Sequence, residues 1–383
     1  MQITKVKIYP VQLPFSADFS HSLRKRSWVK NIVVEIVAEK GNVSGYGEGA
    51  PRSYVTGESQ DSTITSISSF TQKETFPWNL NDVSQIWDFI DSLSNGNTQN
   101  AAICAIETAL LDSLGKHQNK NIIEFFPKNF HTDTVYYGAT IPLDNQQRIL
   151  ELCQLCKKMD INKLRMKMGK DFEQNREAVE IVKEVFGNDY DLRVDVNGVW
   201  NCESALKHFQ LFKEYKVKVI EQPLMPDDST IADLAELMKK NGFILMADES
   251  ACTLKDAEKI NRDGYYKMIN IRLSKCGGFR NTLKIIDYLR SNGIKFQIGC
   301  HLGESGILSA AGRALSILCK DAVYYDGCYD EYLLKENITQ EDVSFGIGGK
   351  GSSLEGPGLG VQINRHGLEY LCDGSPPAII LKP

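Results

Sequence analysis

The sequence predicts an α/β protein in which a (β/α) barrel follows a smaller α+β domain. Short runs of apolar and β-branched residues recur every 26 to 28 residues from Lys167 through Asp195 and Glu221 to Asp248. One strand, one helix and two loops need about that length, and repetition of this unit is typical of a barrel. A barrel needs about 250 residues. The chain has 383, which leaves room for a second domain.

Residues 1–130 are predicted to form the smaller domain. Alternating apolar and polar residues favour antiparallel strands in three segments, residues 3–13, 29–39 and 43–49. Helical patterns fill residues 59–116. Two polar stretches, residues 15–28 and 49–60, are long enough to be lid loops rather than tight turns.

The barrel is predicted over residues 131–355. Eight strand candidates follow one another at nearly equal spacing, with helical stretches between them: residues 135–141, 163–168, 192–196, 217–222, 244–249, 267–273, 295–301 and 322–326. The Gly-rich residues 343–361 then break the rhythm. We expect residues 356–383 to return to the first domain and pack on it.

The composition favours a cytoplasmic enzyme. A net charge of −5 argues against a nucleic-acid partner, and no apolar run approaches the length of a membrane span. The N-terminus does not resemble a signal peptide. The ten cysteines show no disulfide framework, as expected in a reducing compartment. Cys153 and Cys156 form a CxxC inside an amphipathic pattern, which favours core packing over a redox or zinc site.

Three carboxylates and one lysine carry the predicted chemistry. Asp195, Glu221 and Asp248 each end a predicted strand, so they are expected at one edge of the barrel. Unpaired acids so placed repel one another, and a divalent cation resolves the repulsion. Oxygen ligands favour Mg²⁺ or Mn²⁺ over zinc. Lys167, one strand earlier, would face a metal-bound substrate. The alternative is a set of strand-end charges in surface salt bridges.

At this point the sequence resembles a known family. The acid triad, KLRMKMG (163–169), NIRLSKCGG (270–278) and LEGPGLGV (354–361) are similar to the enolase superfamily. The likeness is greatest to its muconate-lactonizing-enzyme branch, within the mandelate racemase/muconate lactonizing enzyme family, and to the dipeptide epimerases. It covers essentially the whole chain. It implies a modified (β/α)7β TIM barrel with an N-terminal α+β capping domain.

The resemblance also implies a reaction. In this superfamily a base removes the proton next to a substrate carboxylate, and an essential Mg²⁺ stabilises the resulting enediolate. By position, Asp195, Glu221 and Asp248 match the metal ligands, and Lys167 matches the base of the KxK motif. Arg165 takes the first position of that motif, where it can still contact the substrate carboxylate.

Arg165 is one departure from the branch, and the sixth strand holds a larger one. Arg272 replaces the second catalytic lysine, and because arginine stays protonated it is a poor base but a good fixed cation. Lys275 is expected to point elsewhere. His301 stands where mandelate racemase relatives carry a catalytic histidine, or it is an ordinary polar residue at a strand end. Glu304 is expected to hydrogen-bond substrate or ligands, or to cap a helix.

Further candidates surround these residues. Asn197 and Glu249 adjoin two predicted ligands and are expected to support them, or to cap loops, and Asn197 is also a substrate-binding candidate. In the predicted lid loops, polar side chains are expected to meet a second polar group of the substrate, or to be solvated: Arg24, Lys25, Arg26, Arg52, Tyr54 and Thr56. Asp326 is a substrate-binding candidate on the eighth strand. Dipeptide epimerases show a DxD there, whereas this chain has Asp326 and Asp330, so a dipeptide substrate is not favoured.

Three functions stay open at this point. The leading interpretation is Mg²⁺-dependent abstraction of the α-proton of a small carboxylate by Lys167. Arg165 and Arg272 would stabilise the product, and cycloisomerisation or β-elimination would follow. The alternative is a two-base racemase or epimerase of an amino-acid derivative that uses Lys167 and His301. The third is a barrel that binds a ligand without catalysis. In each case we expect a homo-oligomer.

Overall fold

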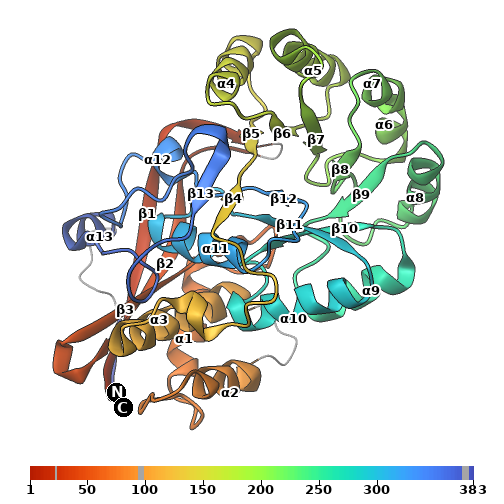
Figure 1. Cartoon of the computed structure of the whole chain (residues 1–383). Helices are drawn as coiled ribbons and strands as arrows, with labels where there is room; N and C mark the ends of the chain where they lie inside the picture. Colours follow the sequence, from red (N-terminus) through yellow and green to blue (C-terminus); the bar gives the residue numbers. More distant parts are fainter. Residues whose placement is uncertain (22–23, 94–98, 373–378) are drawn as a thin grey trace.

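The computed structural model describes residues 1–21, 24–93, 99–372 and 379–383, and describes no side chains for residues 17–26. The chain begins with an antiparallel sheet, seen in red in Figure 1. Its strands lie in the order β14 (Ile379–Leu381), β1 (Ile3–His21), β2 (Arg24–Ala38) and β3 (Val43–Gly49). A short 3-10 helix, η1 (Glu39–Gly41), joins β2 to β3.

The strands β1 and β2 are longer than the sequence predicts. Residues 15–28, expected as a lid loop, include the outer ends of both strands. The antiparallel pairing shifts register between Pro14 and Phe19 and then continues to the pair His21 and Arg24. Continued backbone pairing thus explains why this polar stretch is extended, although its side chains are not apolar.

Helices α1 (Gln60–Phe70) and α3 (Asn100–Gln118) pack on this sheet, and α2 (Val83–Leu93) packs on α3. Residues 100–115 of α3 are all buried. The helix lies close to β3 because Gly45, Gly47 and Gly49 alternate along one face of that strand. A Cβ atom at any of the three would overlap a backbone carbonyl oxygen of α3. These glycines therefore fix the approach of helix to sheet.

The second sheet has eight strands in sequence order, and all their pairings are parallel: β5 (Ala139–Ile141), β6 (Lys163–Lys167), β7 (Asp191–Asp195), β8 (Val219–Glu221), β9 (Ile244–Ala247), β10 (Met268–Arg272), β11 (Lys295–Gly299) and β12 (Tyr324–Tyr325). Beside the two outermost strands, the N–H of Gly138 donates to the carbonyl of Tyr325 at 2.8 Å. The α/β prediction is confirmed, with helices around a parallel sheet and a separate N-terminal sheet (Figure 1).

The first predicted barrel strand, residues 135–141, is divided in two. Residues 134–136 form β4 (Thr134–Tyr136), which pairs with β13 (Lys350–Ser352) in a separate two-stranded sheet. The N–H of Tyr137 donates to the carbonyl of Gly349. Only from Ala139 does the chain join the eight-stranded sheet. An apolar run does not reveal which of two partners its backbone will pair with.

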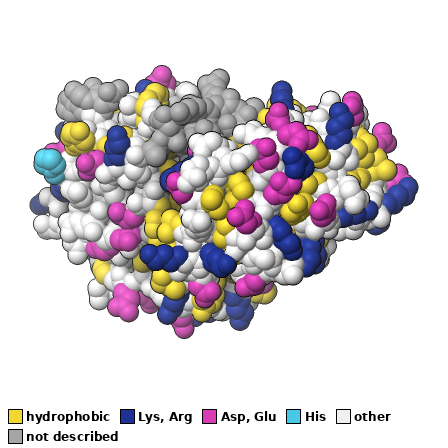
Figure 2. Space-filling model, turned by 90° about the horizontal axis from the view of Figure 1, so that it is seen from above, with side chains coloured by type: hydrophobic (Ala, Val, Ile, Leu, Met, Phe, Trp, Pro, Cys, Tyr) yellow, Lys and Arg dark blue, Asp and Glu magenta, His cyan; other side chains and the backbone are white. Residues whose placement is uncertain are grey.

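Between and after the strands lie the remaining helices: η2 (Ile122–Phe125), α4 (Gln146–Lys158), α5 (Phe172–Phe186), α6 (Cys202–Lys207), α7 (Phe209–Glu214), α8 (Ile231–Lys240), α9 (Leu254–Asp263), α10 (Gly278–Ser291), α11 (Gly306–Ile317), α12 (Asp330–Leu333), η3 (Ile347–Gly349) and α13 (Arg365–Leu371). Within the described ranges, no helix combines the length and apolarity that a membrane crossing requires. On the face shown in Figure 2, acidic and basic side chains are interspersed, as the near balance of 49 acids and 44 bases predicts.

Buried acids of the first sheet and its helices hold the N-termini of two helices beside the parallel sheet. Glu48 of β3 accepts hydrogen bonds from the backbone N–H groups of Ser305 and Leu308, at 3.1 and 3.0 Å, where α11 begins. Glu107 of α3 accepts from the N–H of Arg280, at 2.9 Å, in the first turn of α10. Such N-termini carry unpaired N–H groups and partial positive charge, so carboxylates suit them.

Candidate active site

Three acidic side chains lie at the carboxyl ends of neighbouring strands. Asp195 ends β7, Glu221 ends β8, and Asp248 follows β9 directly. Asp195 is the register partner of Glu221 across the two strands. All three side chains are fully buried. Because the strands are parallel, their carboxyl ends meet at one edge, and the acids face one region.

Cationic side chains from β6 lie against two of these acids. The Arg165 guanidinium donates to both oxygens of Glu221, at 2.7 and 2.8 Å, and also to Asp195. Lys167 Nζ lies 2.5 Å from Asp195 Oδ2 and 2.9 Å from Asn197 Oδ1. Arg165 and Lys167 are two residues apart on one strand, so both point toward the same face.

The third acid has two cations of its own. Arg272, at the end of β10, donates to Asp248. Lys275 Nζ donates to Asp248 Oδ1 at 2.9 Å and to the backbone carbonyl of Asn270 at 2.6 Å. Lys275 was expected to point elsewhere. It lies beyond the end of β10, in the turn that precedes α10, where the alternation of strand side chains no longer applies.

The balance of burial and charge differs among the three acids. Burial acts to raise the pKa of Asp195, but Arg165 and Lys167 outweigh it and hold the pKa below its ordinary value. Burial is likewise outweighed at Asp248, by Arg272 and Lys275. Burial raises the pKa of Glu221, and repulsion from Asp195 and Asp248 adds to the rise despite Arg165. The negative charges of Asp195 and Asp248 therefore act on Glu221, which is the acid least compensated by nearby cations.

The donor set fits a hard divalent cation. All the acids offer oxygen atoms, which Mg²⁺ prefers. Beside them, burial and the negative charges of Asp248 and Asp195 raise the pKa of Glu249 to about 7, and its Oε2 has no hydrogen-bond partner among the described residues. In the described part of the chain, the carboxylate oxygens of Asp195, Glu221 and Asp248 do not all lie within 4.8 Å of one another. The guanidinium groups of Arg165 and Arg272 lie against these acids.

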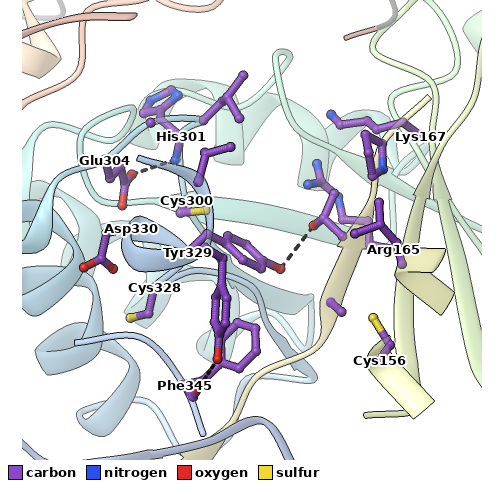
Figure 3. Close-up of a pocket in the computed structure, with 18 of the residues that line it drawn as sticks. Cys156, Arg165, Lys167, Cys300, His301, Glu304, Cys328, Tyr329, Asp330 and Phe345 are labelled. Carbon is purple, nitrogen blue, oxygen red and sulfur yellow. Dashed lines mark hydrogen bonds between the residues drawn. The ribbon is translucent and has the colours of Figure 1, made fainter. Parts of the chain in front are cut away.

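A cavity of about 500 Å³ opens beside these strand ends. Arg165, Lys167 and Arg272 line one end of it, together with His301 and Glu304. Figure 3 shows Lys167 and His301 on opposite sides of the cavity. They come from β6 and from the end of β11, which four strands separate along the sheet. A substrate between them would meet one basic group on each face.

His301 is buried and neutral. Neither ring nitrogen has a hydrogen-bond partner among the described residues. Burial lowers its pKa well below the ordinary value, and the positive charges of Arg272 and Arg52 lower it further. Its backbone N–H donates to Glu304 Oε1 at 2.6 Å, and burial raises the pKa of Glu304 to about 8. His301 thus presents a free imidazole to the cavity.

A family comparison now identifies the chain. The model of the family described as "Enolase C-terminal domain-like" matches residues 148–367, which include the strand-end acids, Arg165, Lys167, Arg272, His301 and Glu304. This chain belongs to the enolase superfamily. The resemblance seen in the sequence is confirmed, including its place in the mandelate racemase/muconate lactonizing enzyme family, and the chain is an enzyme of that superfamily.

Several characterised members of the superfamily are similar to this chain over most of its length. It is 29% identical to the hydrophobic dipeptide epimerase of Enterococcus faecalis, over 82% of this chain and 87% of that one. It is 28% identical to the N-succinyl-L-Arg/Lys racemase of Bacillus cereus, over 97% and 98%. It is also 30% identical to an L-Ala-D/L-Glu epimerase of Bacteroides thetaiotaomicron, over 81% and 76%.

Solved structures agree with these sequence matches. The crystal structure of the Bacillus cereus N-succinyl Arg/Lys racemase superposes with a TM-score of 0.87 at 25% identity and covers all of both chains. The Enterococcus faecalis dipeptide epimerase was solved with Mg and the dipeptide L-Leu-L-Tyr. It superposes with a TM-score of 0.81 at 26% identity, over 94% of this chain and 100% of that one.

Not every residue that the sequence predicts for the site lies at the cavity. Tyr54 lines it, whereas Arg52 and Asp326 do not. Arg52 donates to the carbonyl of Leu302 at 2.8 Å and so ties the loop after His301 to the N-terminal domain. Asp326 Oδ2 lies 3.8 Å from Arg165 Nε. It also accepts a hydrogen bond from Gln297 at 3.3 Å and forms an ion pair with Arg193. The side chains of Arg24, Lys25 and Arg26 lie outside the described residues.

Asn197 and Glu249 lie behind the cavity lining. Asn197 accepts from Lys167 and donates to Glu249 Oε1 at 3.1 Å, so it links the lysine to the acids. Neither residue lines the cavity itself. We infer that both can orient Lys167 and the strand-end acids without touching a substrate.

Part of the cavity wall has no counterpart among the predicted residues. Cys156 on α4, Tyr329 after β12 and Phe345 in the Gly-rich passage all line it. The sequence indicates an amphipathic helix at α4, and Cys153 there is core, as predicted. Periodicity marks an apolar face but does not show whether a domain core or a cavity covers it. These wall residues therefore could not be predicted from the sequence.

Proposed function

We propose that this enzyme racemises or epimerises a carboxylate substrate, an amino-acid derivative, at the carbon next to the carboxylate. Lys167 serves one face of that carbon and His301 the other. The observation that carries the proposal is the placement of these two unlike bases on opposite sides of one cavity, with the ring of His301 free and neutral. Inversion needs proton removal on one face and delivery on the other.

The fixed cations give the substrate its orientation. Arg165 and Arg272 line the same end of the cavity as the two bases, and neither guanidinium can act as a base. They suit a substrate carboxylate, which a planar guanidinium binds with two hydrogen bonds. A carboxylate held there places its α-carbon between Lys167 and His301. Binding of that negative charge also offsets the cations that lower the pKa of His301.

We propose Mg²⁺ as the cofactor, with Mn²⁺ as the alternative, held by Asp195, Glu221 and Asp248. When bound, the cation stabilises the negative charge that develops on the substrate carboxylate as the α-proton leaves. The side chains of the protein carry out the proton transfers. In each direction one of Lys167 and His301 accepts the proton while the other donates one, and the roles reverse for the opposite enantiomer.

The relatives support inversion over the other predicted reactions. The two proteins named above from Bacillus cereus and Enterococcus faecalis are a racemase and an epimerase. One-base cycloisomerisation or β-elimination, the leading interpretation from sequence, is the second candidate. It is favoured by Arg272, which replaces a basic lysine with a fixed cation. We also propose the modified (β/α)7β barrel, the domain limits 1–130, 131–355 and 356–383, a homo-oligomer and a cytoplasmic location.

Proton exchange in D₂O tests the proposal. Single enantiomers of N-acyl amino acids, dipeptides and other carboxylates are incubated with the enzyme and Mg²⁺, then examined by NMR and chiral chromatography. We expect deuterium at the α-carbon together with inversion. Exchange with retention alone, loss of water or ring closure would overturn the two-base mechanism.

Variants assign the two faces. In His301→Asn, inversion should fall at least 100-fold, while one enantiomer still exchanges its proton through Lys167. In Lys167→Ala, the other enantiomer should retain exchange. His117→Asn, at an exposed histidine of α3, is the matched control and should change neither reaction. Equal loss of exchange for both enantiomers in His301→Asn would contradict separate bases.

A further inference from the structure

The cavity has two ends of unlike chemistry. Its charged end holds Arg165, Lys167 and Arg272. The other end, here called the apolar arm, is lined by Leu152, Leu155, Cys156, Met159, Ile161, Leu333 and Phe345. A volume of about 500 Å³ is within the range of pockets that hold drug-sized ligands, roughly 300–1,000 Å³. A small acid bound at the charged end would leave the arm unfilled.

One helix supplies most of the arm. Leu152, Leu155, Cys156 and Met159 are spaced by three and four residues along α4 and its end, so they share one helical face. That face looks into the cavity, as Cys156 does in Figure 3. Burial raises the pKa of the Cys156 thiol to about 11, so it stays uncharged. These four side chains therefore offer apolar contact and no ionised group.

The opposite wall is aromatic and well supported. The ring of Phe345 lies 5.5 Å from that of Tyr329, edge to face, and 5.2 Å from that of Tyr332. The Tyr332 hydroxyl donates to the carbonyl of Phe345 at 2.8 Å. Such packing holds the ring in place, so the arm is formed without a ligand.

A narrow polar belt separates the two ends. The hydroxyls of Thr140 and Tyr329 lie 3.2 Å apart, both residues line the cavity, and Figure 3 shows Tyr329 in its middle. Tyr329 also donates to the carbonyl of Gly138 at 3.0 Å. Because Tyr329 donates to Gly138, Thr140 donates to Tyr329, and both hydroxyl oxygens can still accept a hydrogen bond from an N–H group. An amide group fits this position, between a carboxylate on one side and a hydrocarbon group on the other.

The arm does not suit a second negative charge. Among the described residues lining the cavity, the buried cations are all at the charged end. Arg148, near the arm, is exposed and paired with Glu151 at 3.3 Å. An anionic group in the arm would lose its water without gaining a buried partner, which is unfavourable, whereas a hydrocarbon group gains by burial.

On the basis of the proposed function, we infer that the substrate is an N-acyl α-amino acid whose acyl group is long, uncharged and apolar. The carboxylate lies against Arg165 and Arg272, the amide meets Thr140 and Tyr329, and the acyl chain fills the apolar arm. The arm thereby selects the substrate by the length and charge of the acyl group.

A matched substrate series tests the inference. N-acetyl-, N-pentanoyl-, N-octanoyl- and N-succinyl-leucine share one amino acid and differ only in the acyl group. With α-proton exchange as the readout, kcat/KM should rise at least ten-fold from acetyl to octanoyl. It should be at least ten-fold lower for succinyl than for pentanoyl, which has similar reach. A flat series, or a preference for succinyl, would overturn the inference.

Substitutions in the arm locate the acyl group. Cys156→Trp fills the arm and should lower the octanoyl-to-acetyl ratio of kcat/KM at least ten-fold. Gln154→Trp, at an exposed position on the same helix, should leave that ratio unchanged. Should Cys156→Trp fail to fold, Leu155→Glu places a charge at a partly exposed position of the arm, and the same fall in ratio is expected. An unchanged ratio in a folded variant would contradict the inference.

Failure of the inference is distinguishable from failure of the proposed function. Exchange with every acyl length, unaffected by the arm variants, would leave the two-base chemistry intact and refute only the substrate class. An N-acetyl amino acid with an eight-carbon side chain provides the converse case. A higher kcat/KM for that compound, without a higher kcat/KM for N-octanoyl-leucine, would show that the arm binds the amino-acid side chain and not the acyl group. The absence of exchange with any compound of the series would refute both proposals.

Discussion

Buried carboxylates gather in two regions of this molecule, and their partners differ. At the strand ends, Asp195 and Asp248 lie against guanidinium and ammonium groups. Where the N-terminal domain meets the helices of the parallel sheet, Glu48 and Glu107 lie at the N-termini of α11 and α10 and accept from backbone N–H groups. All four side chains are almost fully buried.

The difference appears in their protonation. Full positive charges outweigh burial and keep the pKa of Asp195 and Asp248 below ordinary values. At Glu107, burial outweighs the backbone donors and raises the pKa to about 8, and burial raises the pKa of Glu48 as well. Backbone donors at a helix terminus thus position a carboxyl group but do not keep it charged. Of the three strand-end acids, Asp195 and Asp248 are held in the charged form, whereas burial raises the pKa of Glu221.

Removal of divalent metal is expected to have the largest effect. If the strand-end acids hold Mg²⁺, a chelator should abolish α-proton exchange, and added Mg²⁺ should restore it. Asp248→Asn should weaken Mg²⁺ binding about 10-fold or more, measured by calorimetry. Undiminished exchange in excess chelator would remove the proposed metal role from this region.

The second-largest effect on activity is expected for substitution of the proposed base, Lys167. Lys167→Ala is expected to slow inversion by about 10²- to 10⁴-fold, the usual contribution of a positioned proton-transfer group. Lys163→Ala, at the exposed start of the same strand, is the control and should stay near the wild-type rate. Comparable losses in both variants would indicate damage to β6 rather than loss of a base.

At the domain interface, the effect should be on stability. Glu48→Ala leaves the buried N–H groups of Ser305 and Leu308 without an acceptor, and Asn31 Nδ2 loses its 2.6 Å bond. We expect a loss of about 3 kcal/mol in the free energy of unfolding, measured with urea. Glu203→Ala breaks an exposed ion pair to Lys207 and should leave the free energy of unfolding nearly unchanged. Equal effects would argue against the interface as a structural element.

A pH dependence of the free energy of unfolding is expected at Glu107. Its pKa is about 8 in the folded chain, above the ordinary 4.5. Between these values the folded state holds a proton that the unfolded state has lost, so stability falls as pH rises, by at most about 1.4 kcal/mol per pH unit. Glu107→Gln keeps an acceptor for Arg280 and should remove this slope. Unfolding midpoints from pH 5 to 8 measure it, and an unchanged slope would refute the raised pKa.

The strand-end positions could be predicted from the sequence because barrel periodicity is strong. Spacing and β-branched runs placed Lys167, Asp195, Glu221 and Asp248 at the ends of successive strands, and in the structure they end or directly follow β6, β7, β8 and β9. Departures from a motif were visible in the same way, because Arg272 could be compared with a known pattern. Both predictions depend only on residues that are near one another in the sequence.

What could not be predicted depends on contacts distant in sequence. The pairing of residues 134–136 with β13 depends on a partner some two hundred residues away. The position of Lys275 depends on a turn rather than on strand alternation. The cavity wall at Cys156 and Phe345 forms where α4 and the Gly-rich passage meet, and an apolar face has the same pattern whether it meets core or cavity.

The pairing of β14 with β1 has a consequence for synthesis. Ile379 pairs with Ile8, so residues 6–8 at the edge of the first sheet lack this partner until the ribosome has made almost the whole chain. During that interval, β1 offers unpaired N–H and C=O groups to other nascent chains. Fragments that stop before residue 379 should therefore be prone to aggregate through this strand, even when their barrels are intact.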